Sequence, residues 1–114
     1  MEYQDDGGFS EDLKNHDAPC VVCNAETRTR QIMIPGKESC PQGWVREYYG
    51  WLVAQQYNDG ASTFACLDVA MEKIAGSASD QQGGLFHLVE AVCGSLQCPP
   101  YVDGRELACV VCTK

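Results

Sequence analysis

A mainly β domain, made of short antiparallel sheets cross-linked by disulfides, is the fold class that this sequence predicts. Its apolar runs are short and rich in valine, isoleucine, tyrosine and tryptophan, residues that favour strands. Eleven glycines and five prolines include the turn signals that separate these runs. Eight cysteines in 114 residues are an even and dense set, typical of small disulfide-linked domains. A chain of this length holds one hydrophobic core.

Residues 1–18 form an acidic N-terminal segment with few apolar residues. Six acids and one base give this segment a net charge of −5, out of −8 for the whole chain. We expect a mobile tail that contributes little to the core. Its carboxylates lack the alternating spacing and the distal glutamate of an EF-hand loop, so calcium binding is not predicted. The folded domain is expected to span residues 19–114.

The tetrapeptide Cys-Val-Val-Cys occurs twice, at 20–23 and at 109–112, near the two ends of the expected domain. Paired valines favour an extended strand, because β-branched side chains fit a pleated surface. In a strand, residues i and i+3 point to opposite faces. We therefore expect the two thiols of each tetrapeptide to reach different neighbours, one above the sheet and one below.

Two strands are expected between the first tetrapeptide and the middle of the chain. Residues 31–34 form a short apolar run that ends at Pro35-Gly36. A turn over residues 40–44 leads into a second run, 45–54, which is rich in tyrosine, tryptophan and valine. Gly50 lies within this run, where it marks a bulge or a close approach of another backbone.

The second half of the chain alternates turn signals with short periodic segments. Apolar residues at i, i+3, i+4 and i+7 predict a helix over residues 65–74. The segment 85–93 fits a helix or a strand, and the Cys-Pro-Pro sequence at 98–100 ends it in either case. A last strand is expected over 106–112. Turns or loops are predicted at 58–60, 76–84 and 102–105.

Charge and hydropathy exclude two classes of partner. A net charge of −8 repels phosphate backbones, so no nucleic acid partner is expected. No run approaches the ~18 apolar residues of a membrane helix, so no membrane insertion is expected. The start of the chain lacks the apolar run of a secretory leader. Because the cysteine density favours an oxidising, extracellular compartment, we expect a secreted protein whose Met1 begins a mature or trimmed chain.

Metal-binding and catalytic interpretations are less favoured. Two Cys-x-x-Cys motifs offer the four thiolates of a structural zinc site, but the Val-Val pairs favour a sheet over a zinc knuckle. No βαβ pattern surrounds either motif, as a redox site would require. His16 and His87 are the two histidines, and no nucleophile elbow or phosphate loop accompanies them. The sequence therefore predicts no metal, no cofactor and no enzymatic activity.

The segment 48–59 allows a glycan-binding interpretation. Flat aromatic rings stack on the faces of pyranose sugars, while amides and carboxylates bind the sugar hydroxyls. The alternative is that Trp51 and one tyrosine face belong to the core, with the other rings partly exposed at a sheet edge. The candidate glycan-binding residues are Tyr48, Trp51, Gln55, Tyr57, Asn58 and Asp59.

From residue 16 onward, the order of motifs resembles a known family. The motifs are Pro-Cys-Val-Val-Cys at 19–23, Ile-Pro at 34–35, Ser-Cys-Pro-Gln-Gly-Trp at 39–44, Tyr-Gly-Trp at 49–51, Ala-Cys-Leu at 65–67, Cys93, Cys98, Gly-Arg-Glu-Leu at 104–107 and Cys-Val-Val-Cys-Thr-Lys at 109–114. This order resembles the C-terminal repeat of spongin-type short-chain collagens, which is related to the non-collagenous C-terminal domain of type IV collagen. The resemblance implies a mostly β-sheet repeat that nucleates or docks collagen chains.

The resemblance also implies a disulfide pairing. The implied pairs are Cys40–Cys112, Cys66–Cys109 and the local pair Cys93–Cys98. In the two-repeat family the first Cys-x-x-Cys serves the cysteines of a preceding repeat, which this sequence does not contain. Cys20 and Cys23 are therefore left to bridge each other, which we favour, or to reach another copy of the chain.

The sequence thus favours a non-enzymatic, secreted extracellular-matrix or assembly module that associates through its sheet surfaces. A repeat that normally packs against its twin exposes an apolar face when alone, and a twofold homodimer is the commonest remedy. Matrix proteins and glycans are further candidate partners. The alternative function is that of a lectin-like glycan-binding protein in recognition or defence.

Overall fold

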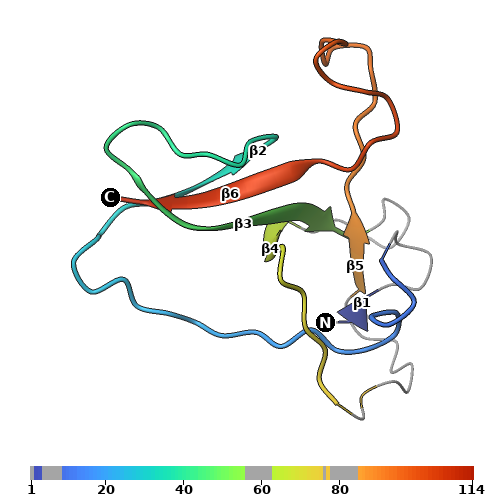
Figure 1. Cartoon of the computed structure of the whole chain (residues 1–114), viewed down its shortest axis with the longest axis horizontal. Helices are drawn as coiled ribbons and strands as arrows, with labels where there is room; N and C mark the ends of the chain where they lie inside the picture. The colour runs from blue at the N-terminus through green and yellow to red at the C-terminus, as the bar shows by residue number, and fades with distance from the viewer. Residues whose placement is uncertain (1, 4–8, 56–62, 76, 78–84) are drawn as a thin grey trace.

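The computed structural model describes residues 2–3, 9–55, 63–75, 77 and 85–114 (Figure 1). Within these residues the chain contains no helix, and its regular structure consists of strands. The prediction of a mainly β fold with disulfides is therefore confirmed. The strands are β1 (Glu2–Tyr3), β2 (Gln31–Pro35), β3 (Val45–Ala54), β4 (Ala65–Asp68), β5 (Leu85–Leu88) and β6 (Ala108–Thr113).

The strands form one sheet with the order β1-β5-β3-β6-β2, and β4 pairs with β3 outside this path. All pairings are antiparallel except that of β1 with β5. β3, the longest strand, is central because β6, β5 and β4 all pair with it. Figure 1 shows β3 and β6 side by side across the middle of the molecule, with β2 beside β6.

A β-bulge near the start of β3 decides the direction of its first side chains. The register with β6 shifts between Arg46 and Tyr48, which makes Glu47 an extra residue. After the bulge Tyr49 lies on the same face as Arg46, whose guanidinium carbon is 4.7 Å from the centre of the Tyr49 ring. The extra residue, Glu47, points toward the end of β6, where it meets Thr113.

Gly50 marks the place where β4 and β6 approach each other across β3. It pairs with Cys109 of β6 on one side and with Asp68 of β4 on the other. Two strands that flank a third ordinarily lie about 9.6 Å apart. The Cα atoms of Cys66 and Cys109 are only 5.7 Å apart, so the sheet curls strongly here. A Cβ at Gly50 would lie 1.7 Å from the carbonyl oxygen of Leu67, which confirms the predicted close approach of another backbone.

Three disulfides connect segments that are far apart in the sequence or close a short loop. In β6, Cys109 and Cys112 project to opposite faces of the sheet, as the spacing of three residues predicts. Both cysteines and Val110 between them are fully buried, so β6 lies at the centre of the molecule. The disulfides, which are the pairs that the resemblance implies, are Cys40–Cys112, Cys66–Cys109 and Cys93–Cys98, with sequence separations of 72, 43 and 5.

The helix predicted over residues 65–74 is wrong. Residues 65–68 are strand β4, and no helix follows them up to residue 74. Leu67 pairs with Trp51 of β3, and Cys66 is bonded to Cys109 of β6, so partners distant in sequence outweigh the local apolar period. The ambiguous segment 85–93 begins with strand β5. The strands expected over 31–34, 45–54 and 106–112 are confirmed as β2, β3 and β6.

The described part of the N-terminal segment belongs to the core, contrary to the expectation of a tail that contributes little to it. β1 pairs with β5 at the edge of the sheet. The ring of Tyr3 lies edge-on against Phe9, with centroids 5.0 Å apart, and its hydroxyl donates a hydrogen bond to the carbonyl of Glu72. One buried cluster contains Tyr3, Phe9, Leu13, Ala18, Val53, Phe86 and Leu88.

Candidate assembly surface

β2 forms an open edge of the sheet, because among the described strands it pairs with β6 alone. The N–H of Gly36, just after β2, donates to the carbonyl of Ala108 at 2.7 Å. Bonded and non-bonded positions alternate in an antiparallel pair. Ile32 and Ile34 therefore bond toward β6, whereas Met33 directs its N–H and C=O away from the sheet. Such an edge is a template for pairing with another chain.

The side chains of β2 are suited to contact with another protein. Its three central residues, Ile32, Met33 and Ile34, are apolar and remain half-buried. Pro35 ends the strand and has no backbone N–H. The N–H groups that could bond to another chain along this edge therefore belong to residues before Pro35. The unpaired edge thus combines outward backbone groups with partly exposed apolar side chains.

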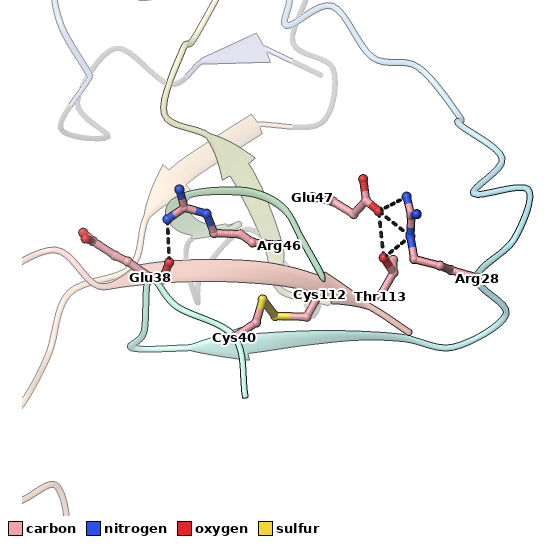
Figure 2. The surroundings of a disulfide bond; sticks show 7 residues. All are labelled: Arg28, Glu38, Cys40, Arg46, Glu47, Cys112 and Thr113. Atoms are coloured by element: carbon pink, nitrogen blue, oxygen red, sulfur yellow. Dashed lines mark hydrogen bonds and ion pairs between the residues drawn. A yellow bond between two sulfur atoms is a disulfide. The ribbon is translucent and has the colours of Figure 1, made fainter. Parts of the chain in front are cut away.

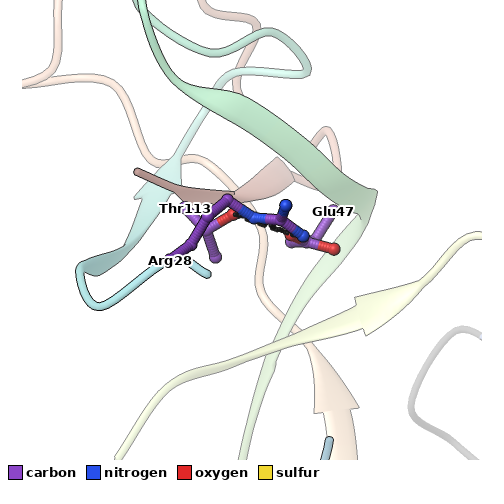
Figure 3. Close-up of polar contacts among 3 residues, drawn as sticks. All are labelled: Arg28, Glu47 and Thr113. Carbon is purple, nitrogen blue, oxygen red and sulfur yellow. Dashed lines mark hydrogen bonds and ion pairs between the residues drawn. The ribbon is translucent and has the colours of Figure 1, made fainter. Parts of the chain in front are cut away.

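A cluster of Arg28, Glu47 and Thr113 fixes the approach of the chain to β2 (Figure 3). One carboxylate oxygen of Glu47 accepts hydrogen bonds from Thr113 Oγ1 at 2.7 Å and from Arg28 Nη2 at 2.6 Å. Arg28 Nε donates to Thr113 Oγ1 at 2.7 Å and to the same oxygen of Glu47 at 3.0 Å. The hydrogen bonds from Thr113 and Arg28 lower the pKa of Glu47. The arrangement clamps the segment before β2 to β3 and β6.

Sequence reasoning missed this cluster, and no local signal could have found it. Arg28 lies 19 residues from Glu47 and 85 residues from Thr113 in the sequence. A lone arginine, glutamate or threonine at these positions is indistinguishable from an ordinary surface residue. Only the bulge in β3 and its register with β6 bring the three side chains together.

The loop before β3 is fixed against β6 by the Cys40–Cys112 disulfide (Figure 2). Close to this disulfide, the Arg46 guanidinium donates to the backbone carbonyl of Glu38 at 3.0 Å. Figure 2 shows the disulfide and the polar cluster attached to adjacent residues of the same strand, Cys112 and Thr113. The segments on both sides of β2 are therefore held to the centre of the sheet. The polar cluster holds the segment before β2, and the Cys40–Cys112 disulfide holds the loop after it.

The first Cys-Val-Val-Cys is neither a strand nor a bridge in the structure. Residues 20–23 lie in the irregular connection that precedes β2. Cys20 and Cys23 are free and exposed, so the expected Cys20–Cys23 disulfide is not formed. The expected strand at 20–23 is also wrong, because these residues join no ladder with any of the described strands. Val21 and Val22 are 81% and 100% exposed.

The candidate glycan-binding residues do not form a stacking site from their described members. Tyr48 and Trp51 are three residues apart beyond the bulge of β3, so their rings leave opposite faces of the sheet. The Tyr48 hydroxyl donates to the carbonyl of Cys66 at 2.8 Å, and burial raises the Tyr48 pKa. Trp51 packs against the buried cluster. Gln55 follows β3, whereas Tyr57, Asn58 and Asp59 lie outside the described residues, and glycan binding stays a prediction.

A concave surface lies where the 91–108 region meets the end of β2. This groove has a volume of about 290 Å³ and is lined by alanine, proline, valine and leucine side chains together with Tyr101, Arg105 and Glu106. The groove is open to solvent and lies next to Gly36, the residue at which the chain leaves β2. It enlarges the apolar surface near the open edge.

Each of the two histidines has a backbone carbonyl as its neighbour. Nδ1 of His16 lies 3.0 Å from the carbonyl of Lys14, and Nδ1 of His87 lies 3.1 Å from the carbonyl of Leu88. Over the residues that the structure describes, no three metal-ligating side chains come together. The same residues include no helix long and apolar enough to span a bilayer.

Three disulfides in so small a domain point to an oxidising, extracellular setting. No protein-family model matches the chain, and no solved structure shows a significant match to it.

Proposed function

We propose that this chain is a secreted, non-enzymatic assembly module of the extracellular matrix that associates with a second copy of itself through the edge of its sheet. The open edge of β2 is the observation that carries this proposal. Its Met33 directs backbone groups outward between two apolar neighbours, and the polar cluster and the Cys40–Cys112 disulfide hold the strand in place.

Three further features support an extracellular assembly role. The disulfides give the small sheet covalent cross-links suited to an oxidising medium. Exposed apolar side chains, among them Phe64 and Val92, leave surface that a partner can cover. The order of motifs resembles the C-terminal repeat of short-chain collagens, a family whose C-terminal domains dock chains. A twofold homodimer is the simplest closed assembly for such a surface.

Met33→Pro tests this function. Proline removes the outward N–H at a position that makes no bond to β6, so the pairing of β2 within the sheet is retained. In a background with Cys20→Ser and Cys23→Ser, sedimentation equilibrium should show a reversible dimer for the parent protein. The Met33→Pro variant should remain monomeric at the same concentration.

Met33→Ala is the matched control, because it removes the same side chain and keeps the N–H. It should still dimerise, although more weakly. A parent protein that stays monomeric at every concentration, or a Met33→Pro variant that dimerises like the parent, would refute assembly through β2. Circular dichroism of each variant establishes that the sheet is intact.

A further inference from the structure

The tetrapeptide Cys-Val-Val-Cys occurs twice in the chain, and its two copies differ in structure and in the state of their cysteines. At 109–112 it is part of β6, where both cysteines are bridged and the four residues are buried. At 20–23 it joins no strand, both thiols are free, and the two valines are almost fully exposed. The backbone of Val21, Val22 and Cys23 takes part in none of the hydrogen bonds found among the described residues. This segment is therefore an apolar stretch outside the sheet that carries two free, exposed thiols.

The other cysteines leave no thiol within the chain for these two to reach. All eight cysteines lie in the described part of the chain, and six of them are consumed by the three disulfides. When two folded copies meet, the thiols available for a new bond are Cys20 and Cys23 of each copy. A covalent link between copies must therefore form at this tetrapeptide.

The valines oppose closure of a bridge within one tetrapeptide. A disulfide needs Cα atoms about 4.4–6.8 Å apart, whereas three residues of extended chain span roughly 10 Å. A turn would bring the two cysteines together, but β-branched valines disfavour the compact conformations that turns need. In this chain Val21 and Val22 occupy both central positions. The extended form instead presents the thiols to another molecule.

We propose that Cys20 and Cys23 form disulfides with the same residues of a second copy, which lock the assembled dimer covalently. Two segments that run parallel about a twofold axis bring Cys20 opposite the partner's Cys20 and Cys23 opposite the partner's Cys23. In an extended backbone with a period of three, both thiols face this axis. The inference rests on the proposed function, because assembly through β2 supplies the second copy.

Each interchain bond is an oxidation in which a small-molecule disulfide, such as oxidised glutathione, is the electron acceptor. A thiolate of one copy attacks the small disulfide, forms a mixed disulfide and releases one glutathione thiolate. The corresponding thiolate of the second copy then attacks the protein sulfur of the mixed disulfide and releases the second glutathione. Two protein thiols lose two protons and two electrons, and one oxidised glutathione becomes two reduced molecules.

The test is oxidation of the full chain in a glutathione redox buffer, followed by non-reducing electrophoresis and peptide mapping. The expected product has twice the mass of the chain, and the map should link Cys20 to Cys20 and Cys23 to Cys23. The double variant Cys20→Ser with Cys23→Ser should give no covalent dimer and should retain its three internal disulfides. Replacing Val21-Val22 by Pro-Gly, which favours a turn, should shift the product toward a monomer with a Cys20–Cys23 bridge.

Three outcomes would overturn the inference. They are a wild-type monomer bridged between Cys20 and Cys23, two thiols that remain open to alkylation in the redox buffer, and a dimer linked through other cysteines. The double serine variant separates this result from the proposed function. If that variant dimerises reversibly while the wild type forms no interchain disulfide, assembly through β2 stands and only the covalent lock is wrong.

Discussion

One carboxylate oxygen of Glu47 accepts hydrogen bonds from Thr113 and from two nitrogens of Arg28. The three side chains come from the segment before β2, from the bulge of β3 and from the last residue of β6. The side chains of Arg28 and Glu47 keep about one third of their surface exposed, whereas Thr113 is buried. At the residue scale, these hydrogen bonds attach the irregular segment around Arg28 to β3 and β6. That segment leads into β2, the open edge of the sheet.

Glu47→Gln should make folding less sensitive to acid. Hydrogen bonds from Thr113 and Arg28 lower the pKa of Glu47 from its usual 4.5 in the folded protein. A carboxylate with a lowered folded pKa stabilises the protein above its unfolded pKa, and this contribution is lost as the pH falls through the folded pKa. Below pH 4.5, the urea midpoint of the wild type should therefore decrease more steeply than that of the variant.

Glu38→Gln is the control for this titration. Only the backbone carbonyl of Glu38 is bonded to Arg46, and its carboxylate points away from that residue (Figure 2). The pH profile of this variant should follow that of the wild type. Identical slopes for the wild type and Glu47→Gln below pH 4.5 would show that the cluster does not form in solution.

At the scale of elements, the N-terminal segment departs most from what its composition predicts. Its charge suggests a solvated tail, yet three widely spaced side chains, Tyr3, Phe9 and Leu13, are buried against β3 and β5. Sequence arguments weigh the average of a segment, whereas burial depends on the few large residues that meet a complementary surface. The surface that receives them is made by Phe86 and Leu88, which are distant in sequence.

Phe9→Ala should destabilise the protein by about 3 kcal/mol or more, because it opens a cavity in the buried cluster. Urea unfolding followed by tryptophan fluorescence measures this change. Phe64→Ala is the matched control, since Phe64 is exposed and its truncation should change stability by less than about 0.5 kcal/mol. Equal effects of the two variants would mean that the N-terminal segment does not pack on the sheet.

Strands were predictable where local composition and tertiary pairing agree. The runs that became β2, β3 and β6 contain β-branched and aromatic residues and end at turn residues, so their sequences suffice. β4 was not predictable, because its apolar residues have a helical period and its strand form depends on β3 and on the bond from Cys66 to Cys109. Gly50 could be singled out as a close approach, but the backbone that approaches it could not.

At the scale of the whole molecule, two long-range disulfides hold the ends of the sheet together through one strand. Cys109 and Cys112 belong to β6, and their partners lie 43 and 72 residues away. The third disulfide closes a loop of only 5 residues. Because a cross-link restricts the unfolded chain more when it closes a longer loop, the disulfides should contribute unequally.

Replacing both cysteines of a pair by alanine should reveal this difference. Loop-closure entropy predicts a loss of about 4 kcal/mol for each of the pairs 40–112 and 66–109, and about 2 kcal/mol for the pair 93–98. Free energies of unfolding in urea measure the three variants against the wild type. An equal or larger loss for the local pair would contradict the view that β6 holds the molecule together.

The candidate assembly surface was only partly predictable from the sequence. The resemblance to a repeat that normally packs against a twin predicts association through a sheet surface, but it does not predict which strand is left open. That depends on the strand order, which places β2 beside β6 at the edge, and on a ladder register that turns Met33 outward. The predicted Cys20–Cys23 disulfide is absent from the structure. The spacing of two cysteines in the sequence gives their separation along the chain, but it does not give the path of the backbone between them.

The position of β6 in the chain has a consequence for synthesis. This strand lies between β2 and β3, yet it is made after both of them, and its Cys109 and Cys112 complete bonds begun much earlier. While the ribosome is still translating, Cys40 and Cys66 have no native partners, and the neighbouring strands have nothing to fill the space between them. The native bonds Cys40–Cys112 and Cys66–Cys109 can therefore close only after Cys109 and Cys112 have been synthesised, so the sheet acquires its long-range cross-links late, after its other strands have been made.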